Sequence, residues 1–171
     1  MKQIVGNRYL KSYKFSSLQE TSVFINNQKT SNILSIDDTF GDNYLCYVCY
    51  HSLTNEKEFV LSFCSNEKEE NLIFLFWDEY KLFVLDTGKN IYLINDTLNI
   101  AASFDISICL IGLYLTNKNN LLILEEASFK LINPKGQILM NESLDLIENF
   151  SIENGKLSIQ TSEENKTFEL A

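Results

Sequence analysis

Short apolar runs separated by polar clusters recur along almost the whole chain. Most runs are five to eight residues long, and the clusters between them are rich in Asn, Asp, Gly, Lys and Glu. This length and this punctuation are typical of β-strands joined by turns. We therefore predict an all-β fold. The expected strands cover residues 9–15, 32–36, 44–52, 58–65, 72–77, 82–86, 91–95, 100–106, 108–116, 121–125, 129–133, 137–140, 157–161 and 167–170.

Two stretches have features of a helix. Ser17 followed by Glu20 has the form of a capping box, which predicts a short helix over residues 17–25. The apolar positions of residues 144–150 have a mixed spacing that fits either a helix or a strand. We expect at most one or two short helices.

Several of the expected strands are apolar on both faces. In residues 72–77 the even and the odd positions are all large hydrophobic side chains, and residues 108–115 show the same property. A strand of a simple two-layer sandwich has one polar face. Stacked antiparallel sheets cover both faces of a strand, as neighbouring blades of a β-propeller do. The sequence thus favours repeated antiparallel hairpins or blades.

A pattern in the second half of the chain nearly repeats itself. LFVLDT at 82–87, followed by IYLINDTLNI at 91–100, returns as LLILEE at 121–126, followed by KLINPKGQIL at 130–139. LSIQT at 157–161 begins a truncated third copy. A period of about 38 residues is typical of repeats in which each copy is one supersecondary unit.

The segments IYLINDTLNI and KLINPKGQIL resemble the third strand, turn and fourth strand of β-propeller repeats of the quinoprotein and WD kind, and the resemblance covers roughly residues 43–161. It implies about four small blades, either closed or as an incomplete propeller. The chain departs from the family pattern in three ways. Asn95 and Asn133 stand where an Asp commonly ends the third strand, no Gly-His opens a repeat, and Trp77-Asp78 is the sole WD dipeptide.

The composition favours a packed chain that needs neither disulfide nor metal to fold. The sequence has 171 residues, of which 45% are hydrophobic. We expect a single domain over residues 1–171, in which a basic N-terminal segment, 1–42, packs on the sheet of an acidic repeat region, 43–171. No apolar run is long enough for a signal-peptide core or a membrane span, which predicts a cytoplasmic protein with reduced cysteines.

Charge is spread unevenly along the chain. Up to Ile36 five Lys and Arg face the single acid Glu20, whereas from Asp37 onward nine Lys face 22 acids, and the net charge is −9. Phosphate binding needs Lys and Arg clustered on one face, so this balance argues against nucleic acid and against an anionic membrane as partners. An acidic body instead attracts basic proteins.

The only histidine lies in the segment CYVCYH, close to three of the four cysteines. Cys46, Cys49, His51 and Cys64 are together of the right type to bind Zn²⁺. In a strand, however, Cys46 points to the face opposite Cys49 and His51, and buried reduced cysteines are the simpler interpretation. We predict no metal and no cofactor, and the same interpretation applies to a Cys49–His51 nucleophile pair.

Motifs of the common enzyme classes are absent from the sequence. Neither GxGxxG nor GxxxxGK occurs, and GxSxG and HExxH are also missing. We expect a non-enzymatic protein. An enzyme that uses paired carboxylates is an alternative, because acids are abundant in the predicted turns.

Acidic turns interleaved with aromatic residues predict a surface for a basic protein partner. In size, charge and composition the chain is similar to bacterial toxin-immunity proteins. That similarity implies an inhibitor that neutralises a basic toxin, such as a nuclease, as a monomer or in a partner-dependent heterodimer. A structural or scaffold module of the propeller type is the alternative. The candidate partner-binding residues are Glu67, Glu69, Glu70, Trp77, Asp78 and Glu79.

Overall fold

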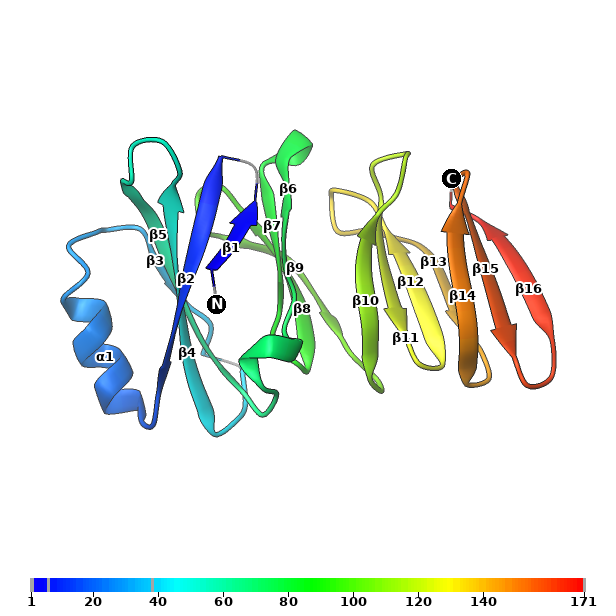
Figure 1. Ribbon diagram of the computed structural model, residues 1–171, viewed down its shortest axis with the longest axis horizontal. Coiled ribbons are helices and arrows are strands. Elements are labelled where there is room, and N and C mark those ends of the chain that lie inside the picture. Colours follow the sequence, from blue (N-terminus) through cyan, green and yellow to red (C-terminus); the bar gives the residue numbers. More distant parts are fainter. Residues whose placement is uncertain (1, 6, 38, 171) are drawn as a thin grey trace. The chain divides into compact units, whose positions relative to one another are not determined.

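The computed structural model describes residues 2–5, 7–37 and 39–170, and these residues form an all-β protein (Figure 1). The prediction of an all-β fold with few helices is confirmed. The helices are α1 (Leu18–Asn26) and two 3-10 turns, η1 (Glu69–Asn71) and η2 (Asp78–Tyr80). The strands are β1 (Lys2–Val5), β2 (Arg8–Phe15), β3 (Ile33–Ser35), β4 (Asn43–His51), β5 (Lys57–Ser65), β6 (Phe74–Trp77), β7 (Leu82–Asp86), β8 (Asn90–Asn95), β9 (Ile100–Asp105), β10 (Leu110–Leu115), β11 (Leu121–Glu125), β12 (Ser128–Ile132), β13 (Ile138–Ser143), β14 (Ile147–Glu153), β15 (Lys156–Thr161) and β16 (Asn165–Glu169).

The strands are arranged in four sheets. The first has the order β1-β2-β4-β5-β3, with β3 parallel to β5 and the other pairs antiparallel. The second, β6 to β9, and the third, β10 to β13, are four-stranded antiparallel meanders, and the fourth is a three-stranded meander, β14 to β16. A four-stranded antiparallel meander is the form of a propeller blade, so the predicted propeller-like blades are confirmed.

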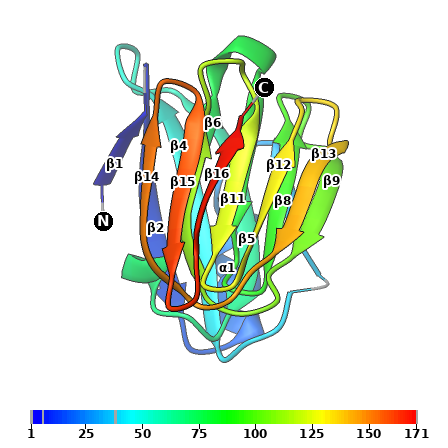
Figure 2. The same ribbon diagram turned by 90° about the vertical axis from the view of Figure 1, so that its right-hand side faces the viewer.

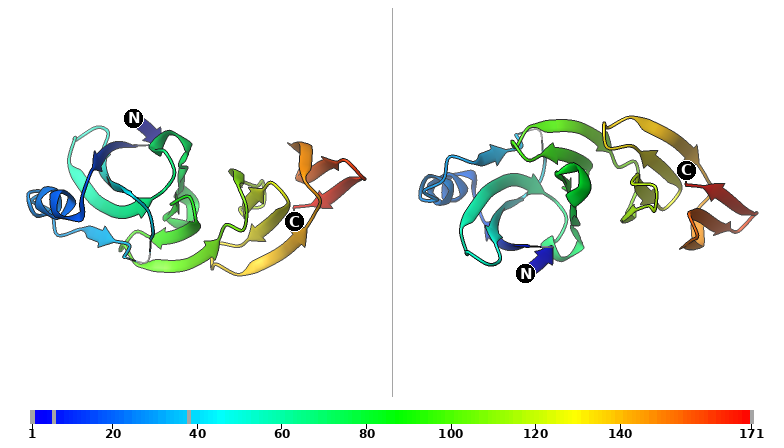
Figure 3. Two further views of the ribbon diagram at one scale, coloured as in Figure 1. Left: turned by 90° about the horizontal axis from the view of Figure 1, so that it is seen from below. Right: turned by 90° about the horizontal axis from the view of Figure 1, so that it is seen from above.

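The chain divides into two compact units, residues 1–105 with the first two sheets and residues 106–171 with the last two. The expectation of one domain over residues 1–171 stays a prediction. The basic segment, 1–42, supplies β1, β2 and β3 to the first sheet. Its helix α1 lies on the outer side of that sheet (Figure 3).

Each unit has its own apolar core. In the first unit, side chains of the first and second sheets meet, and the rings of Phe59 and Phe83 have centroids 4.5 Å apart. In the second unit, the third and fourth sheets meet around Leu122, Phe129 and Leu157. Every side chain of β7 and of β11 is buried. Cover on both faces was expected for residues 72–77 and 108–115. In 72–77 four side chains are buried and two are half-buried, whereas Ile108 and Leu115 are 52% and 40% exposed, so the expectation is wrong for the edge strand β10.

The sequence repeat corresponds to the sheets. Leu82 and Leu121, 39 residues apart, are the first residues of β7 and β11, which are the second strands of the two four-stranded meanders. Both meanders have a register irregularity at the same place, between Leu93 and Ile94 in β8 and between Leu131 and Ile132 in β12. The copies thus share local backbone detail as well as apolar spacing.

The turn after the third strand is also built alike in both copies. The side-chain oxygen of Asn95 accepts hydrogen bonds from the backbone N–H groups two and four residues further on, at 3.1 and 2.8 Å. The side-chain oxygen of Asn133 does the same at 3.0 and 3.0 Å. An amide oxygen accepts these bonds as a carboxylate oxygen does, so Asn in place of the usual Asp of propeller repeats costs no hydrogen bond here.

A buried carboxylate ends the second strand of each four-stranded meander. Asp86, at the end of β7, accepts hydrogen bonds from the N–H groups of Ile73, at 3.3 Å, and Gly88, at 2.7 Å. Glu125, at the end of β11, accepts two N–H groups of residues 107–108 at 2.6 and 3.3 Å and forms an ion pair with Lys130. Each carboxylate therefore fastens the second strand to the segment that leads into the first.

The fourth sheet has one polar face. Ser151, Ser158 and Thr167 are cross-strand partners on this face, whereas Ile152 and Leu157 point to the core of the second unit. Figure 2 shows its three strands side by side. The apolar face of this sheet thus covers the third sheet, and its other face presents hydrophilic side chains.

Residues 144–150 fit either a helix or a strand by their spacing. Residues 147–150 form the first part of β14, and residues 144–146 form the connection from β13. A register irregularity between Ile147 and Asn149 explains the ambiguity. An extra residue at a bulge shifts the alternation by one, so apolar positions three residues apart share a face. Strand β1 was not expected from the sequence.

Helix α1 begins at the predicted cap. The Ser17 hydroxyl accepts a hydrogen bond from the N–H of Glu20 at 3.2 Å. The Glu20 carboxylate accepts the N–H and the hydroxyl of Ser16, at 3.0 and 2.9 Å, where a capping box has the N–H of the cap residue itself. These bonds hold the pKa of Glu20 below its usual value. Among the described residues, no helix has the length and apolar character needed to cross a membrane.

The asparagine turns generate a prediction about stability. Asn133→Ala removes the acceptor of two backbone hydrogen bonds and should lower the free energy of unfolding by about 1–2 kcal/mol in urea titrations. Asn133→Asp keeps the acceptor and should cost less. Asn141→Ala, on the exposed side of β13, is the matched control and should be near neutral. Equal effects of Asn133→Ala and Asn141→Ala would contradict the role of the turn.

Candidate functional site at the acidic loops of the first unit

Loops at the two ends of β6 carry the acidic residues predicted from the sequence. Glu67, Glu69 and Glu70 lie in η1 or just before it, and Asp78 and Glu79 lie in η2. Strand β6 separates the two groups, and four residues of strand span about 13 Å. The structure therefore divides the predicted site into two acidic groups at opposite ends of β6.

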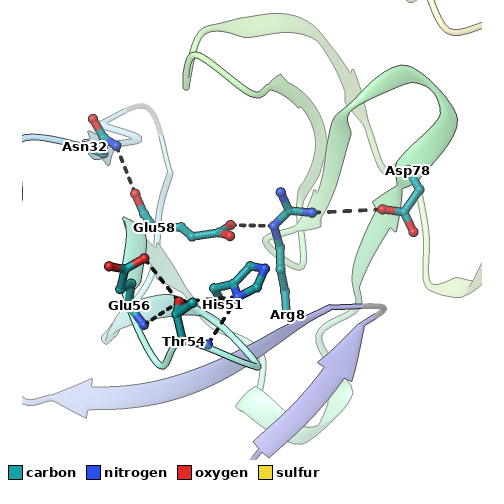
Figure 4. A network of polar contacts seen from close by, with 7 residues as sticks. All are labelled: Arg8, Asn32, His51, Thr54, Glu56, Glu58 and Asp78. Atoms are coloured by element: carbon teal, nitrogen blue, oxygen red, sulfur yellow. Dashed lines mark hydrogen bonds and ion pairs between the residues drawn. The ribbon is translucent and has the colours of Figure 1, made fainter.

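The group at η2 lies among charges of both signs (Figure 4). The Nε of Arg8 is 2.5 Å from Oε2 of Glu58, and its Nη1 is 4.0 Å from Oδ1 of Asp78. The guanidinium carbon of Arg8 is 4.3 Å from the centroid of the Phe76 ring. Arg8 thus offsets part of the negative charge at this end, which weakens the field that Asp78 and Glu79 present to a cation.

Trp77 is the aromatic member of the predicted site, and its side chain is 2% exposed. Its ring packs edge to face against Tyr80, with centroids 5.5 Å apart. Tyr80 is 42% exposed and is the aromatic side chain that η2 presents at the surface. A contact of Trp77 itself with a partner would need this packing to open.

The group at η1 is joined by a second acidic loop. The N–H of Asp42 donates to the side-chain oxygen of Asn66 at 3.3 Å, and the amide of Asn43 donates to the carbonyl of Glu67 at 3.1 Å. The loop between β3 and β4 therefore lies against the loop between β5 and η1. This brings Asp37 and Asp42 to the same end of the first unit as the three glutamates.

We call these five residues the acidic loop surface. Four of its members are exposed and Glu69 is half-buried. Lys68 lies on the same loop, 4.0 Å from Glu70, and Lys89 lies on the neighbouring turn. Acids therefore outnumber bases on these loops, and the net field is negative. The acidic loop surface consists of Asp37, Asp42, Glu67, Glu69 and Glu70.

Asp86 holds the turn at residues 87–88, and the acidic loop packs against that turn. The hydroxyl of Ser65 donates to the carbonyl of Thr87 at 2.7 Å, which fastens the acidic loop to the turn that follows Asp86. A side chain at Gly88 would lie 2.6 Å from the Glu67 side chain, so the turn and the loop are in close contact. The loop after β5 and the turn after β7 thus form one packed structure.

Burial, with a smaller contribution from the charge of Glu67, raises the pKa of Asp86 to about 6, although its two N–H donors act in the opposite direction. Burial, followed by the charges of Glu69 and Asp86, also raises the pKa of Tyr47. Glu67 is therefore close enough to Asp86 for their charges to interact, and Tyr47 is close enough to Glu69 and Asp86. Asp86 is 2% exposed and accepts two backbone bonds, so its position suits a structural role better than proton transfer to a bound substrate.

The cysteines near the histidine are parts of the first sheet. Cys46 and Cys49 are buried on opposite faces of β4, and burial raises the pKa of their thiols to about 11 and about 12. Such thiols are protonated at neutral pH and are poor nucleophiles and metal ligands. The His51 ring lies 3.4 Å from the Thr54 hydroxyl. Among the described residues, no group of three or more His, Cys, Asp or Glu is arranged to hold a metal ion.

Sequence reasoning identified the three glutamates but did not include Asp37 and Asp42 in the site. These loops are 24 residues or more apart in the chain, and the β4–β5 hairpin brings them together by pairing Asn43 with Ser65. The signal in the sequence was the two acidic clusters at the outer ends of two successive predicted strands. A hairpin places those two ends side by side.

No protein-family model matches the sequence, and no curated protein matches it. Among solved structures, BamB from Moraxella catarrhalis aligns with a TM-score of 0.48 and 15% identity over 73% of this chain and 39% of that chain. A protein of unknown function from Bacteroides caccae aligns with a TM-score of 0.44 and 9% identity, over 68% of this chain and 51% of that one. Hsv2 from Kluyveromyces marxianus aligns with a TM-score of 0.44 and 7% identity, over 75% and 47%. The chain thus spans 39% to about half of the length of these proteins, and its propeller-like character rests on its own sheets.

The buried carboxyl of Asp86 predicts a pH dependence of stability. Its pKa is raised from 3.8 to about 6, so its protonated form favours folding, and that contribution is present below about pH 4 and lost as the pH rises through 6. The free energy of unfolding of the natural chain minus that of Asp86→Asn should therefore fall between pH 4 and pH 7 in urea titrations.

Asp96→Asn, in the exposed turn after β8, is the control for removal of one negative charge. A difference between the natural chain and Asp86→Asn that rises with pH would show that the two N–H donors outweigh burial, and the assigned pKa direction would be wrong.

Proposed function

We propose that this chain is a non-enzymatic protein-binding module and that its acidic loop surface binds a basic protein. The supporting observation is the gathering of five carboxylates from two loops at one end of the first unit, with two lysines on the same loops and the adjoining turn. Fields of one sign raise the association rate of partners of the opposite sign and align them on approach. The net charge of −9 acts in the same direction at longer range.

The specific form of the proposal is an immunity-type inhibitor of a basic toxin, for example a nuclease. The substrate-binding face of a nuclease carries Lys and Arg for phosphates. Carboxylates spaced along two adjoining loops present negative charge to such a face and compete with the nucleic acid. On this proposal the protein acts in the cytoplasm, as a monomer that forms a heterodimer with the toxin.

Charge reversal tests the site. On this proposal a basic toxin is encoded next to this chain, because an inhibitor and its toxin must be made together, and that product is the partner to use. A neighbouring product that is not basic would itself argue against the toxin. Glu67→Lys, Glu69→Lys and Glu70→Lys combined should weaken its binding at least about tenfold at low salt, and more salt should weaken the natural complex. The matched control combines Asp78→Lys, Glu79→Lys and Asp96→Lys, which makes the same total change of charge outside the acidic loop surface and should have a smaller effect. Unchanged affinity of the triple glutamate variant at low salt would refute the site.

A scaffold module is the second candidate. Its support is the outer strand β13, which among the described residues pairs only with β12 and exposes Ile138 and Leu139 at 51% and 50%. An edge strand with exposed apolar side chains is able to pair with another chain.

Sedimentation velocity separates the two candidates. An inhibitor should stay monomeric up to high concentration and form a 1:1 complex only with the basic partner. A scaffold should self-associate as its concentration rises, and Ile138→Lys with Leu139→Lys should abolish that association. Self-association that survives this double variant would argue against β13 as the contact.

A further inference from the structure

A cleft of about 730 Å³ lies between α1 and the loop that joins β3 to β4, within the first unit. Leu18 and Ile25 of α1 form one wall and Phe40 stands in the other, while Ser62 and Cys64 of β5 contribute to the floor. The volume is in the range of sites that hold a small ligand or one or two side chains of a partner. This cleft is not part of the site predicted from the sequence.

Thr39 and Gly41 hold their part of the loop wall against the first sheet. The hydroxyl of Thr39 donates to the carbonyl of Ile36 at 2.8 Å and accepts the N–H of Cys64 at 2.8 Å. A side chain at Gly41 would lie 2.1 Å from the carbonyl carbon of Ser65, so only glycine allows the loop to approach β5 this closely. A wall held by such contacts is formed before a partner arrives, which reduces the ordering cost of binding.

The lining combines exposed apolar side chains with negative charge. Leu18 is 64% exposed and Phe40 is 75% exposed, although large apolar side chains of this kind are usually covered. Asp37 and Asp42 also line the cleft, and no Lys or Arg does so among the described residues. The cleft therefore suits a group that is apolar and carries a positive charge nearby.

We propose that this cleft is the anchor site for the basic partner, in which one large apolar side chain enters between Leu18 and Phe40 while an adjacent Lys or Arg pairs with Asp37 and Asp42. Those two aspartates also belong to the acidic loop surface, so the cleft and that surface form one continuous face. This inference rests on the proposed function and names the point of insertion. Apolar anchors in preformed pockets within charged surroundings carry much of the binding energy of protein interfaces.

A second copy of this chain fits the cleft less well. Two chains of net charge −9 repel each other, and the repulsion is greatest where acids line the contact. An anionic small molecule is disfavoured for the same reason. A basic polypeptide segment satisfies both the apolar walls and the two carboxylates.

Three fluorescein-labelled ten-residue peptides test the proposal by fluorescence anisotropy with the full chain. The first has a central Leu-Phe pair flanked by lysines, the second has alanines in place of the pair, and the third has glutamates in place of the lysines. The first should bind at least about tenfold more tightly than the other two, because both the apolar and the charged contact are needed. Equal binding of the first two would overturn the proposal, since charge alone would then suffice.

Two variants place the binding in the cleft. Leu18→Ser with Phe40→Ser and, separately, Asp37→Asn with Asp42→Asn should each weaken the first peptide about tenfold. All four residues are exposed at the surface, so both variants should fold, and thermal unfolding checks this. The matched controls are Leu53→Ser with Leu146→Ser, at side chains 84% and 62% exposed outside the cleft, and Asp96→Asn with Asp145→Asn, at exposed acids outside it. Equal weakening by these controls would show that the cleft has no special role.

The same variants separate this inference from the proposed function. If the basic toxin that the proposed function requires loses affinity on reversal of Glu67, Glu69 and Glu70 but binds both cleft variants as tightly as the natural chain, the acidic surface stands and the anchor site is refuted. If that protein is indifferent to all of these changes, both proposals fail. Loss of affinity with the cleft variants, together with peptide binding that needs the apolar pair, supports the anchor site.

Discussion

Burial of a strand on both of its faces is the constraint on which the rest of this structure depends. The side chains of β7 and β11 are all buried, so each strand has to be an inner strand of its sheet with apolar cover above and below. An inner strand of this kind leaves few places for a polar side chain. The two that occur, Asp86 and Glu125, stand at strand ends where backbone N–H groups are available, and there they fix how the chain enters each sheet.

The functional proposals follow from that arrangement in the first unit. Asp86 holds the turn after β7, and the hydroxyl of Ser65 fastens the loop after β5 to it. The β3–β4 loop then rests on the same segment through Gly41. The backbone that carries the exposed acids is therefore held by contacts of buried residues. A charged surface that is held in this way loses less entropy on binding than a mobile one.

Much of the fold was accessible from the sequence because it depends on local pattern. The repeat, the strand positions and the cap of α1 are set by residues close to one another in the chain. The bulge at residues 147–149 hid the alternation of β14, and the pairing that creates it involves β15, which spacing within one segment does not reveal.

The candidate site was predicted from the sequence only in part. The glutamates of η1 stood out as a run, but Asp37 and Asp42 join them only through the β4–β5 hairpin, and the opposite position of Asp78 follows from the direction of β6.

The polar face of the fourth sheet limits what can cover it. Ser151, Ser158 and Thr167 place hydroxyls side by side across the three strands, so any group that covers this face has to supply hydrogen bonds. The opposite face of the same sheet sends Ile152 and Leu157 into the core of the second unit. Large apolar side chains at the three hydroxyl positions would create an uncovered hydrophobic patch, and such patches favour aggregation.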